Sequence, residues 1–250
     1  MVPEGRHVRS VYLDDRTGVS GTDLSKHLIV DCSTIDTATH LAVAEHLQSK
    51  HAGVRFHDAP VTGGVLGAEA GTLAFFLGCS ESDSASFGPI AELLGCMGRK
   101  VISCGGPSLG LVTKLSNNYL SGLIAIASSE ALNMGIRAGM DPVVLASAFS
   151  AGTAQNAICD KFNPVPGVVR GAPSSHGYKG GFKVQLMKKD FALAVDMANH
   201  VEANIALGFA GLRVYEEASE DPRCRDLDSR VVYRFLGGPE DRVVGYQPPE

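Results

Sequence analysis

The chain changes its pattern near residue 106, and this change constrains the fold more than any other feature. Before it, short apolar runs typical of buried strands alternate with segments whose apolar residues recur at helical spacing. After it, residues 109–138 are apolar almost all round, as in a helix that is buried on several sides. The pattern predicts an α/β half with an open, largely parallel sheet, followed by an all-helical half.

The expected elements follow from these periodicities and from their flanking residues. Asp36 or Thr37 is placed to cap a first helix, Gly139 to end the long one, and Asp141 to open the next. We expect strands at residues 27–32, 54–57, 72–78 and 100–104, and helices at 37–50, 83–97, 109–138, 183–206, 208–218 and 226–236. The chain then divides into residues 1–106, residues 107–236 and a loosely ordered tail at 237–250.

Composition excludes several classes of partner. The 250 residues carry a formal net charge of −5, which favours neither nucleic acid nor an anionic membrane. No apolar run approaches the length of a membrane span. The six cysteines form no C-x-x-C pair and no Cys/His cluster with zinc spacing, so we expect buried thiols, a reducing compartment and no metal.

Residues 58–64, with the sequence D-A-P-V-T-G-G, follow an expected strand. They predict a turn whose polar groups can bind a ligand. Gly63 and Gly64 have no Cβ and tolerate positive φ, so their backbone amides can face a cleft beside the Thr62 hydroxyl. Such a turn can hold a small carboxylate. An ordinary hairpin turn is the alternative interpretation.

Lys114 is the second candidate, because it lies early in the long apolar helix. Asn117 and Asn118 follow at three and four residues, which places all three on neighbouring parts of one helical face. A lysine on a mostly buried helix needs a partner or a functional site, and a positioned lysine can exchange protons. Alternatively, Lys114 reaches solvent from the first turn and Asn118 makes a structural bond.

Three further stretches contain candidate residues. Ser33 and Thr34 follow a strand at the edge where open sheets bind ligands, although such residues before a helix are usually caps. Lys189 and its neighbour Asp190 are typical of a solvated helical face. Phe182 follows two glycines and suits either a lid over a pocket or a loop anchor.

These stretches together resemble the β-hydroxyacid dehydrogenase family over about residues 1–236. Residues 58–64 are similar to its substrate motif D-A-P-V-S-G-G, with Thr62 in place of serine, and residues 110–118 to its K-x-x-N-N helix. Further similarities are residues 31–36 (D-C-S-T-I-D), residues 65–73, the Lys189-Asp190 pair and residues 163–168. The last resembles the branch that acts on 3-hydroxyisobutyrate in valine breakdown, and so predicts that substrate.

The resemblance implies a partial, N-terminally truncated Rossmann-like sheet followed by an all-α C-terminal domain. It implies hydride transfer between a small 3-hydroxy acid and NAD, with NADP as the alternative. Lys114 would be the general acid/base and Asn118 would orient it, while Thr62, Gly63, Gly64 and Ser33 would bind the substrate.

The resemblance also implies a cofactor site, an assembly and a location. Residues beside the cofactor would be Val2, Pro3, Thr34, Lys189 and Phe182. Residues 1–106 would be an incomplete dinucleotide-binding domain, and residues 107–236 a substrate and dimerisation domain of a homo-oligomer. The family's location is the mitochondrial matrix, with the cytoplasm as the alternative because the sequence shows no targeting segment.

One departure from the family pattern concerns phosphate binding. No G-x-G-x-x-G precedes a helix, and the nearest candidate, residues 105–110, has Pro107 where the middle glycine belongs. We therefore expect weak dinucleotide binding and an exposed sheet edge. Two explanations remain open, an incomplete sequence or a natural short form, and so do two other functions: a non-catalytic binding or oligomerisation module, and a related semialdehyde reductase.

Overall fold

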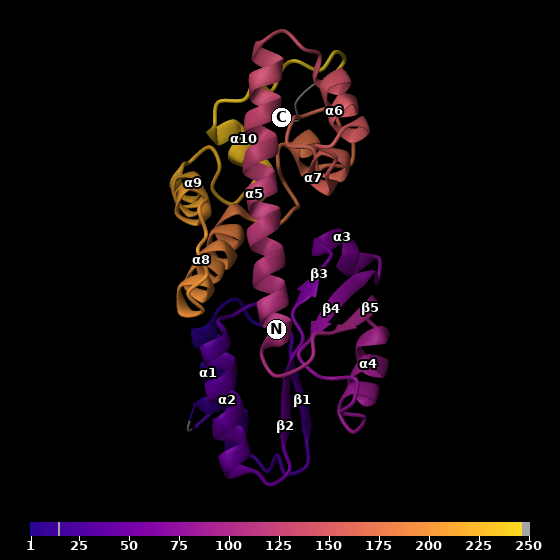
Figure 1. Cartoon of the computed structure of the whole chain (residues 1–250). Coiled ribbons are helices and arrows are strands. Elements are labelled where there is room, and N and C mark those ends of the chain that lie inside the picture. The colour runs from indigo at the N-terminus through magenta and orange to yellow at the C-terminus, as the bar shows by residue number, and fades with distance from the viewer. Residues whose placement is uncertain (15, 247–250) are drawn as a thin grey trace. The chain divides into compact units, whose positions relative to one another are not determined.

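The computed structural model describes residues 1–14 and 16–246, which form two compact units (Figure 1). Unit 1 is Met1–Asn117 and unit 2 is Asn118–Glu250. The sequence places the boundary at residue 106, whereas the units divide inside the long helix, eleven residues later. In the described residues, no helix is both long and apolar enough to cross a membrane.

The described residues of unit 1 include five strands. Its elements are α1 (Gly5–Leu13), a 3₁₀ turn (Val19–Gly21), β1 (Leu28–Asp31), α2 (Thr37–Lys50), β2 (Arg55–Asp58), β3 (Val61–Thr62), α3 (Gly64–Glu69), β4 (Leu73–Leu77), α4 (Phe87–Gly95), β5 (Gly98–Ser103) and the first turns of α5 (Leu109–Arg137). The predicted α2 is confirmed at both ends, and the Asp36 side chain accepts a bond from Thr39 N. Helix α1 was not predicted, and α4 starts four residues later than expected.

Strand pairing differs in part from the predicted parallel sheet. Strands β1 and β2 are parallel, as are β4 and β5, but β3 runs antiparallel to β4. The chain leaves β2 after Asp58, and Gly78 N then donates to the Asp58 carbonyl and Phe76 N to the Pro60 carbonyl. Pro60 has no N–H to donate, so the segment between β2 and β3 changes neighbours there. Among the described strands, β1 pairs only with β2.

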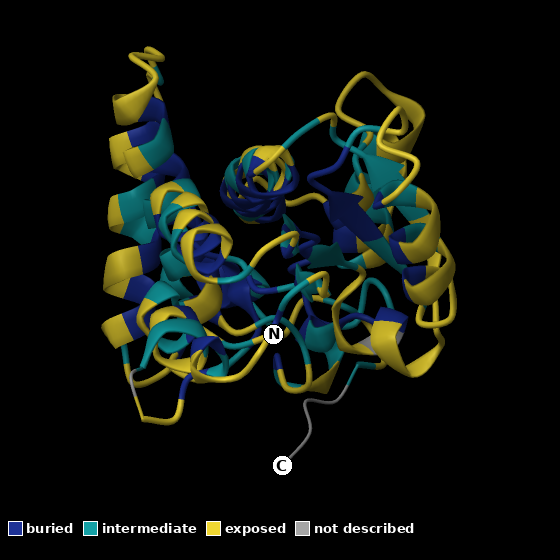
Figure 2. Cartoon of the chain, turned by 90° about the horizontal axis from the view of Figure 1, so that it is seen from below, coloured by how far each residue is buried: buried dark blue, intermediate teal, exposed yellow. Residues whose placement is uncertain are grey.

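The strands contribute to apolar cores on both faces. Neighbouring side chains of a strand point to opposite sides, so one strand can supply residues to two cores. Ile29 and Phe56 belong to a core with α1 and α2, whereas Val30 belongs to a second core with α4. In Figure 2 the helices are exposed along one side and buried along the other, while the strands are mostly buried or intermediate. Such burial on both faces explains why the strands read as apolar runs rather than alternating ones.

The start of α5 is fixed by a buried carboxylate. Asp58, 1% exposed, accepts bonds from Ser108 N at 2.9 Å and from Leu111 N at 2.7 Å. A carboxylate is favourable there because the first amides of a helix lack intrahelical acceptors and carry partial positive charge. His40 Nε2 lies 3.5 Å from Asp58, but burial lowers the pKa of His40, so the neutral ring contributes little countercharge. The amides of α5 therefore stabilise the charge.

Close backbone approach makes this arrangement possible. Gly110 packs so tightly that a Cβ there would overlap the carbonyl oxygen of Phe76, and a Cβ on Gly78 would overlap the Asp58 carboxylate. Glycine is thus required on both sides of the contact. The contact joins β2, the end of β4 and the first turn of α5 within unit 1.

Unit 2 is helical, as predicted. Its elements are the rest of α5, α6 (Pro142–Ala151), α7 (Ala157–Lys161), a 3₁₀ turn (Pro173–His176), α8 (Val184–His200), α9 (Gly208–Glu220), a 3₁₀ turn (Ser229–Val231) and α10 (Val232–Phe235). Helix α8 ends six residues earlier than expected, and the helix expected at 226–236 is only a 3₁₀ turn and one α-helical turn. Phe191, Tyr215 and Val232 lie in the larger core of unit 2.

Part of the segment expected to be loose makes defined contacts. The Tyr233 hydroxyl donates to Pro239 O at 2.9 Å, and Arg234 pairs with Glu240 at 2.6 Å. Val243 packs against the smaller core of unit 2. Residues 237–246 are thus held by hydrogen bonds and packing, and residues 247–250 lie outside the described residues.

Asp58→Asn is expected to lower the free energy of unfolding by about 2–3 kcal/mol, because the amide group would face an N–H donor and leave it unbonded in the interior. Urea denaturation measures the change. Asp141→Asn is the control, since Asp141 caps α6 in an exposed position with bonds from Val143 N and Val144 N. Asparagine is a good N-cap, so that variant should change stability by less than about 0.5 kcal/mol. Equal effects would contradict the role given to Asp58.

Gly110→Ala is expected to destabilise the fold by about 2 kcal/mol or more, because the new Cβ overlaps backbone that cannot move without disturbing Asp58. Gly88→Ala in α4 is the matched control, since a Cβ there meets nothing within 4 Å. That change should be neutral or stabilise by up to about 1 kcal/mol. Thermal unfolding of both variants gives the comparison, and a stable Gly110→Ala protein would refute the close approach.

Candidate active site

Residues 62–64 lie where β3 ends and α3 begins. Thr62 is half-buried, while Gly63 and Gly64 are exposed and have φ of +134° and +63°. A Cβ on Gly63 would lie 3.0 Å from Leu73 Cδ2, so both conformation and space require glycine there. The alternative interpretation was an ordinary hairpin turn, but α3 separates β3 from β4, so the connection between these antiparallel strands is longer than such a turn. The segment offers exposed backbone beside a hydroxyl.

Lys114 lies on the first turns of α5, within unit 1, and is 8% exposed. Lys114 lies one turn after Leu111, whose backbone N–H donates a hydrogen bond to Asp58 Oδ2. The carboxylate that fixes the start of the helix therefore also fixes the backbone position of the lysine. The predicted long helix is confirmed, from Leu109 to Arg137. The lysine is thus a buried side chain on a regular helix, which differs from the solvent-exposed position of the alternative interpretation.

Asn118 lies in unit 2 and bonds a buried acid. Its Nδ2 donates to Asp190 Oδ2 at 2.6 Å, and the two residues are 6% and 2% exposed. The prediction of a solvated face is wrong for Asp190, although Lys189 Nζ pairs with it at 3.0 Å. The signal was present in the sequence, because Asp190 has the helical spacing of the buried Met187 and Ala194. The acid holds the Asn118 amide in one orientation.

Ser33 is tied into a buried network at the carboxyl end of β1. It is 1% exposed, its hydroxyl donates to Asp31 Oδ1 at 2.6 Å and accepts from Val2 N at 2.8 Å. The structure therefore brings Ser33 and Val2 together, and Asp31 is a participant that the sequence reasoning missed. The only hydroxyl donor of Ser33 is used within the protein.

The other cofactor candidates have differing environments. Thr34 is half-buried just beyond β1, and Pro3 is exposed. In unit 2, Lys189 is half-buried, and Phe182 packs against the larger core while its backbone N donates to Asp228 Oδ2 at 2.8 Å. Phe182 is therefore an anchor of its loop.

A dinucleotide fits only part of the observed edge. Open sheets bind dinucleotides beyond the carboxyl ends of parallel strands, which is where Thr34 and the tethered Val2 lie. Glu4, at the N-cap of α1, would repel a pyrophosphate at that helix start, and its carboxylate is paired with Arg6 at 2.7 Å.

Two family models cover nearly the whole chain. Residues 1–106 match the NAD binding domain of 6-phosphogluconate dehydrogenase, and residues 109–236 match the NAD-binding domain of NADP-dependent 3-hydroxyisobutyrate dehydrogenase. Their order agrees with the observed α/β part followed by a helical part.

Individual relatives give the same result. The chain is 41% identical over 238 residues to the probable mitochondrial 3-hydroxyisobutyrate dehydrogenase of Dictyostelium discoideum, covering 94% of this chain and 71% of that protein. It is 38% identical to the 3-hydroxyisobutyrate dehydrogenase of Pseudomonas aeruginosa, covering 95% and 78%.

A solved structure agrees as well. The Mycobacterium tuberculosis 3-hydroxyisobutyrate dehydrogenase with L-serine matches with a TM-score of 0.84 and 32% identity, covering 94% of this chain and 77% of that one. The order of motifs, the helical unit 2 and these likenesses lead to one conclusion. The chain belongs to the 3-hydroxyisobutyrate dehydrogenase family.

Proposed function

We propose that this protein reversibly oxidises 3-hydroxyisobutyrate, with NAD as hydride acceptor and Lys114 as general acid/base. The observation that carries the proposal is the buried Lys114 on a helix whose first turn is fixed by Asp58, in a chain of this family. A lysine held in this way has a defined position and limited contact with water. Both properties are needed for proton transfer in step with hydride transfer.

In the oxidation direction, Lys114 Nζ accepts the proton of the substrate hydroxyl as the carbonyl forms. In the reduction direction, the same nitrogen returns the proton to the carbonyl oxygen. When bound, nicotinamide supplies the hydride acceptor or donor. Asn118 is given the role of orienting the reacting groups, which its bond to the buried Asp190 supports because that bond restricts the amide.

The substrate carboxylate is assigned to residues 62–64. Exposed glycine backbone at positive φ, beside a hydroxyl, offers neutral hydrogen-bond donors to an anion. Ser33 is given a supporting role rather than direct contact, because its donor is used by Asp31. It holds the Val2 segment against β1.

The nicotinamide end of the cofactor is assigned to Thr34, Val2 and Pro3. Lys189 and Phe182 are carried over from the family resemblance, and both remain predictions. NAD is preferred and NADP is the alternative, which parallel assays with each cofactor distinguish.

Two narrower statements also remain predictions. Assembly into a homo-oligomer is supported by large apolar side chains of unit 2 that are exposed in the single chain, including Met134 at 71% and Phe209 at 65%. A mitochondrial location is supported by the names of the relatives from Dictyostelium discoideum and Rattus norvegicus, although the family also includes bacterial members.

Lys114→Met should reduce the rate of 3-hydroxyisobutyrate oxidation by about 10²–10⁴-fold, because it removes the proton acceptor and keeps the volume. Production of reduced cofactor measures the rate. Lys100→Met is the control, since Lys100 is exposed on β5, and it should retain wild-type turnover. Wild-type levels of activity in Lys114→Met would disprove the role of this lysine. A wild-type chain that binds the acid but reduces neither NAD nor NADP would favour the non-catalytic alternative.

Thr62→Val should raise the KM for 3-hydroxyisobutyrate by about tenfold with a smaller change in kcat, because it removes one hydrogen bond to the carboxylate, worth about 1.5 kcal/mol. The methyl ester of the substrate provides a second test, since it lacks the anion and should be nearly insensitive to the change. Thr153→Val, at an exposed position, is the control. An unchanged KM in Thr62→Val would remove residue 62 from the substrate site.

A further inference from the structure

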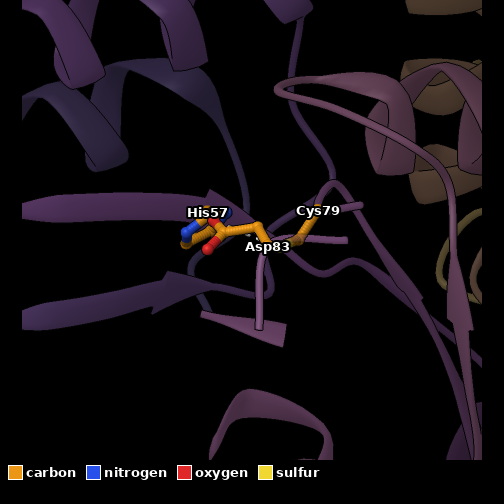
Figure 3. Close-up of side chains that lie close together, drawn as sticks. All are labelled: His57, Cys79 and Asp83. Carbon is orange, nitrogen blue, oxygen red and sulfur yellow. Dashed lines mark hydrogen bonds between the residues drawn. The ribbon is translucent and has the colours of Figure 1, made fainter. Parts of the chain in front are cut away.

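Three potential metal ligands meet in unit 1 on the face of the sheet opposite Asp58. His57 precedes Asp58 on β2, so its side chain points to the other side, toward the core with α4. There one ligand atom each from His57, Cys79 and Asp83 lies within 4.8 Å of the others (Figure 3). We call these residues the His57 cluster.

The histidine of this cluster is oriented as a ligand. His57 Nδ1 lies 3.3 Å from the carbonyl oxygen of Gly78, which can only accept a hydrogen bond. Nδ1 must therefore carry the proton, which leaves the lone pair on Nε2. Nε2 is buried and has no hydrogen-bond partner in the part of the chain that the structure describes. A histidine held by a backbone carbonyl through one nitrogen, with the other available, has the arrangement found in metal sites.

The thiol and the carboxylate complete the donor set. Cys79 is 2% exposed, and its Sγ lies 3.9 Å from Asp83 Oδ2. Burial, followed by the Asp83 charge, raises the pKa of this thiol. Asp83 Oδ1 accepts a bond from Ser86 N at 3.2 Å, and hydrogen bonds from Ser86 lower the pKa of Asp83. One carboxylate oxygen is thus held by the start of α4 while the other faces the sulfur.

We propose that the His57 cluster binds a zinc-class divalent ion through His57 Nε2, Cys79 Sγ and Asp83 Oδ2. One nitrogen, one sulfur and one oxygen form a borderline-soft set that suits Zn²⁺, and Asp83 is exposed, which gives the ion an entry path. Binding forms the S–Zn bond and releases the thiol proton to water, so affinity rises with pH. The fourth position is left for water.

The ion would have a structural role. It would connect the end of β2, the segment after β4 and the turn before α4, and would stabilise the folded state by binding only to it. The positive charge of Arg55 opposes the binding of a cation, because its guanidinium lies beside the cluster and donates to Ser86 Oγ at 3.2 Å. We therefore expect affinity in the micromolar range, weaker than that of a four-ligand zinc site.

The test uses the whole chain, freed of metal with a chelator and titrated with Co²⁺ as a spectroscopic probe. One equivalent should bind and give visible d–d bands with a thiolate-to-cobalt charge-transfer band, which Zn²⁺ should displace. Cys79→Ser should abolish the charge-transfer band, and Asp83→Asn should weaken binding by about 10–100-fold. The controls are Cys96→Ser and His200→Gln, both at exposed positions, which should bind as wild type does.

A second measurement does not require a variant to fold. Zn²⁺ should slow alkylation of Cys79 in the wild-type chain, followed by peptide mass spectrometry, while the exposed Cys96 reacts at an unchanged rate. Absence of stoichiometric Co²⁺ or Zn²⁺ binding at micromolar concentrations would overturn the proposal. So would a charge-transfer band that persists in Cys79→Ser, or alkylation of Cys79 that is indifferent to Zn²⁺.

Discussion

The Asp58 carboxylate is the interaction on which the rest of unit 1 depends. Asp58 is the last residue of β2, and its carboxylate accepts hydrogen bonds from two amides at the start of α5. It lies where Gly78 and Gly110 allow the backbones to approach. A buried charge is costly unless its hydrogen bonds are satisfied, and here the helix amides satisfy them. The same bonds fix the first turns of α5, and with them Lys114. Stability and the proposed chemistry therefore share one contact.

Buried polar pairs fix the candidate residues in both units. Asp31 orients Ser33, which holds Val2, and Asp190 orients Asn118. In each case the acid has no proposed contact with the substrate. It restricts the orientation of a neighbouring side chain that has a proposed role. Preorganisation of this kind reduces the entropy lost when reacting groups are aligned, and it explains why acids remain in largely apolar surroundings.

Adjacent residues of β2 serve two different environments. Asp58 faces the start of α5, while His57 faces the α4 side and meets Cys79 and Asp83. The alternation of a strand is sufficient to separate the two, because successive side chains leave opposite faces of the sheet. The proposed ion would therefore stabilise the sheet from the side away from the Asp58 contact, without contributing to the chemistry assigned to Lys114.

The sequence by itself determined the local elements and the family motifs. The Asp36 cap, the start of α5 at Leu109 and the Asp141-Pro142 start of α6 depend on periodicity and on neighbouring residues, and all were predicted. Only the tertiary structure decided the antiparallel β3, the Asp58 contact 50 and 53 residues away along the chain, the burial of Asp190 and the meeting of His57 with Cys79. These features join residues that are distant in the chain, and their energies come from packing and desolvation, which no local pattern records.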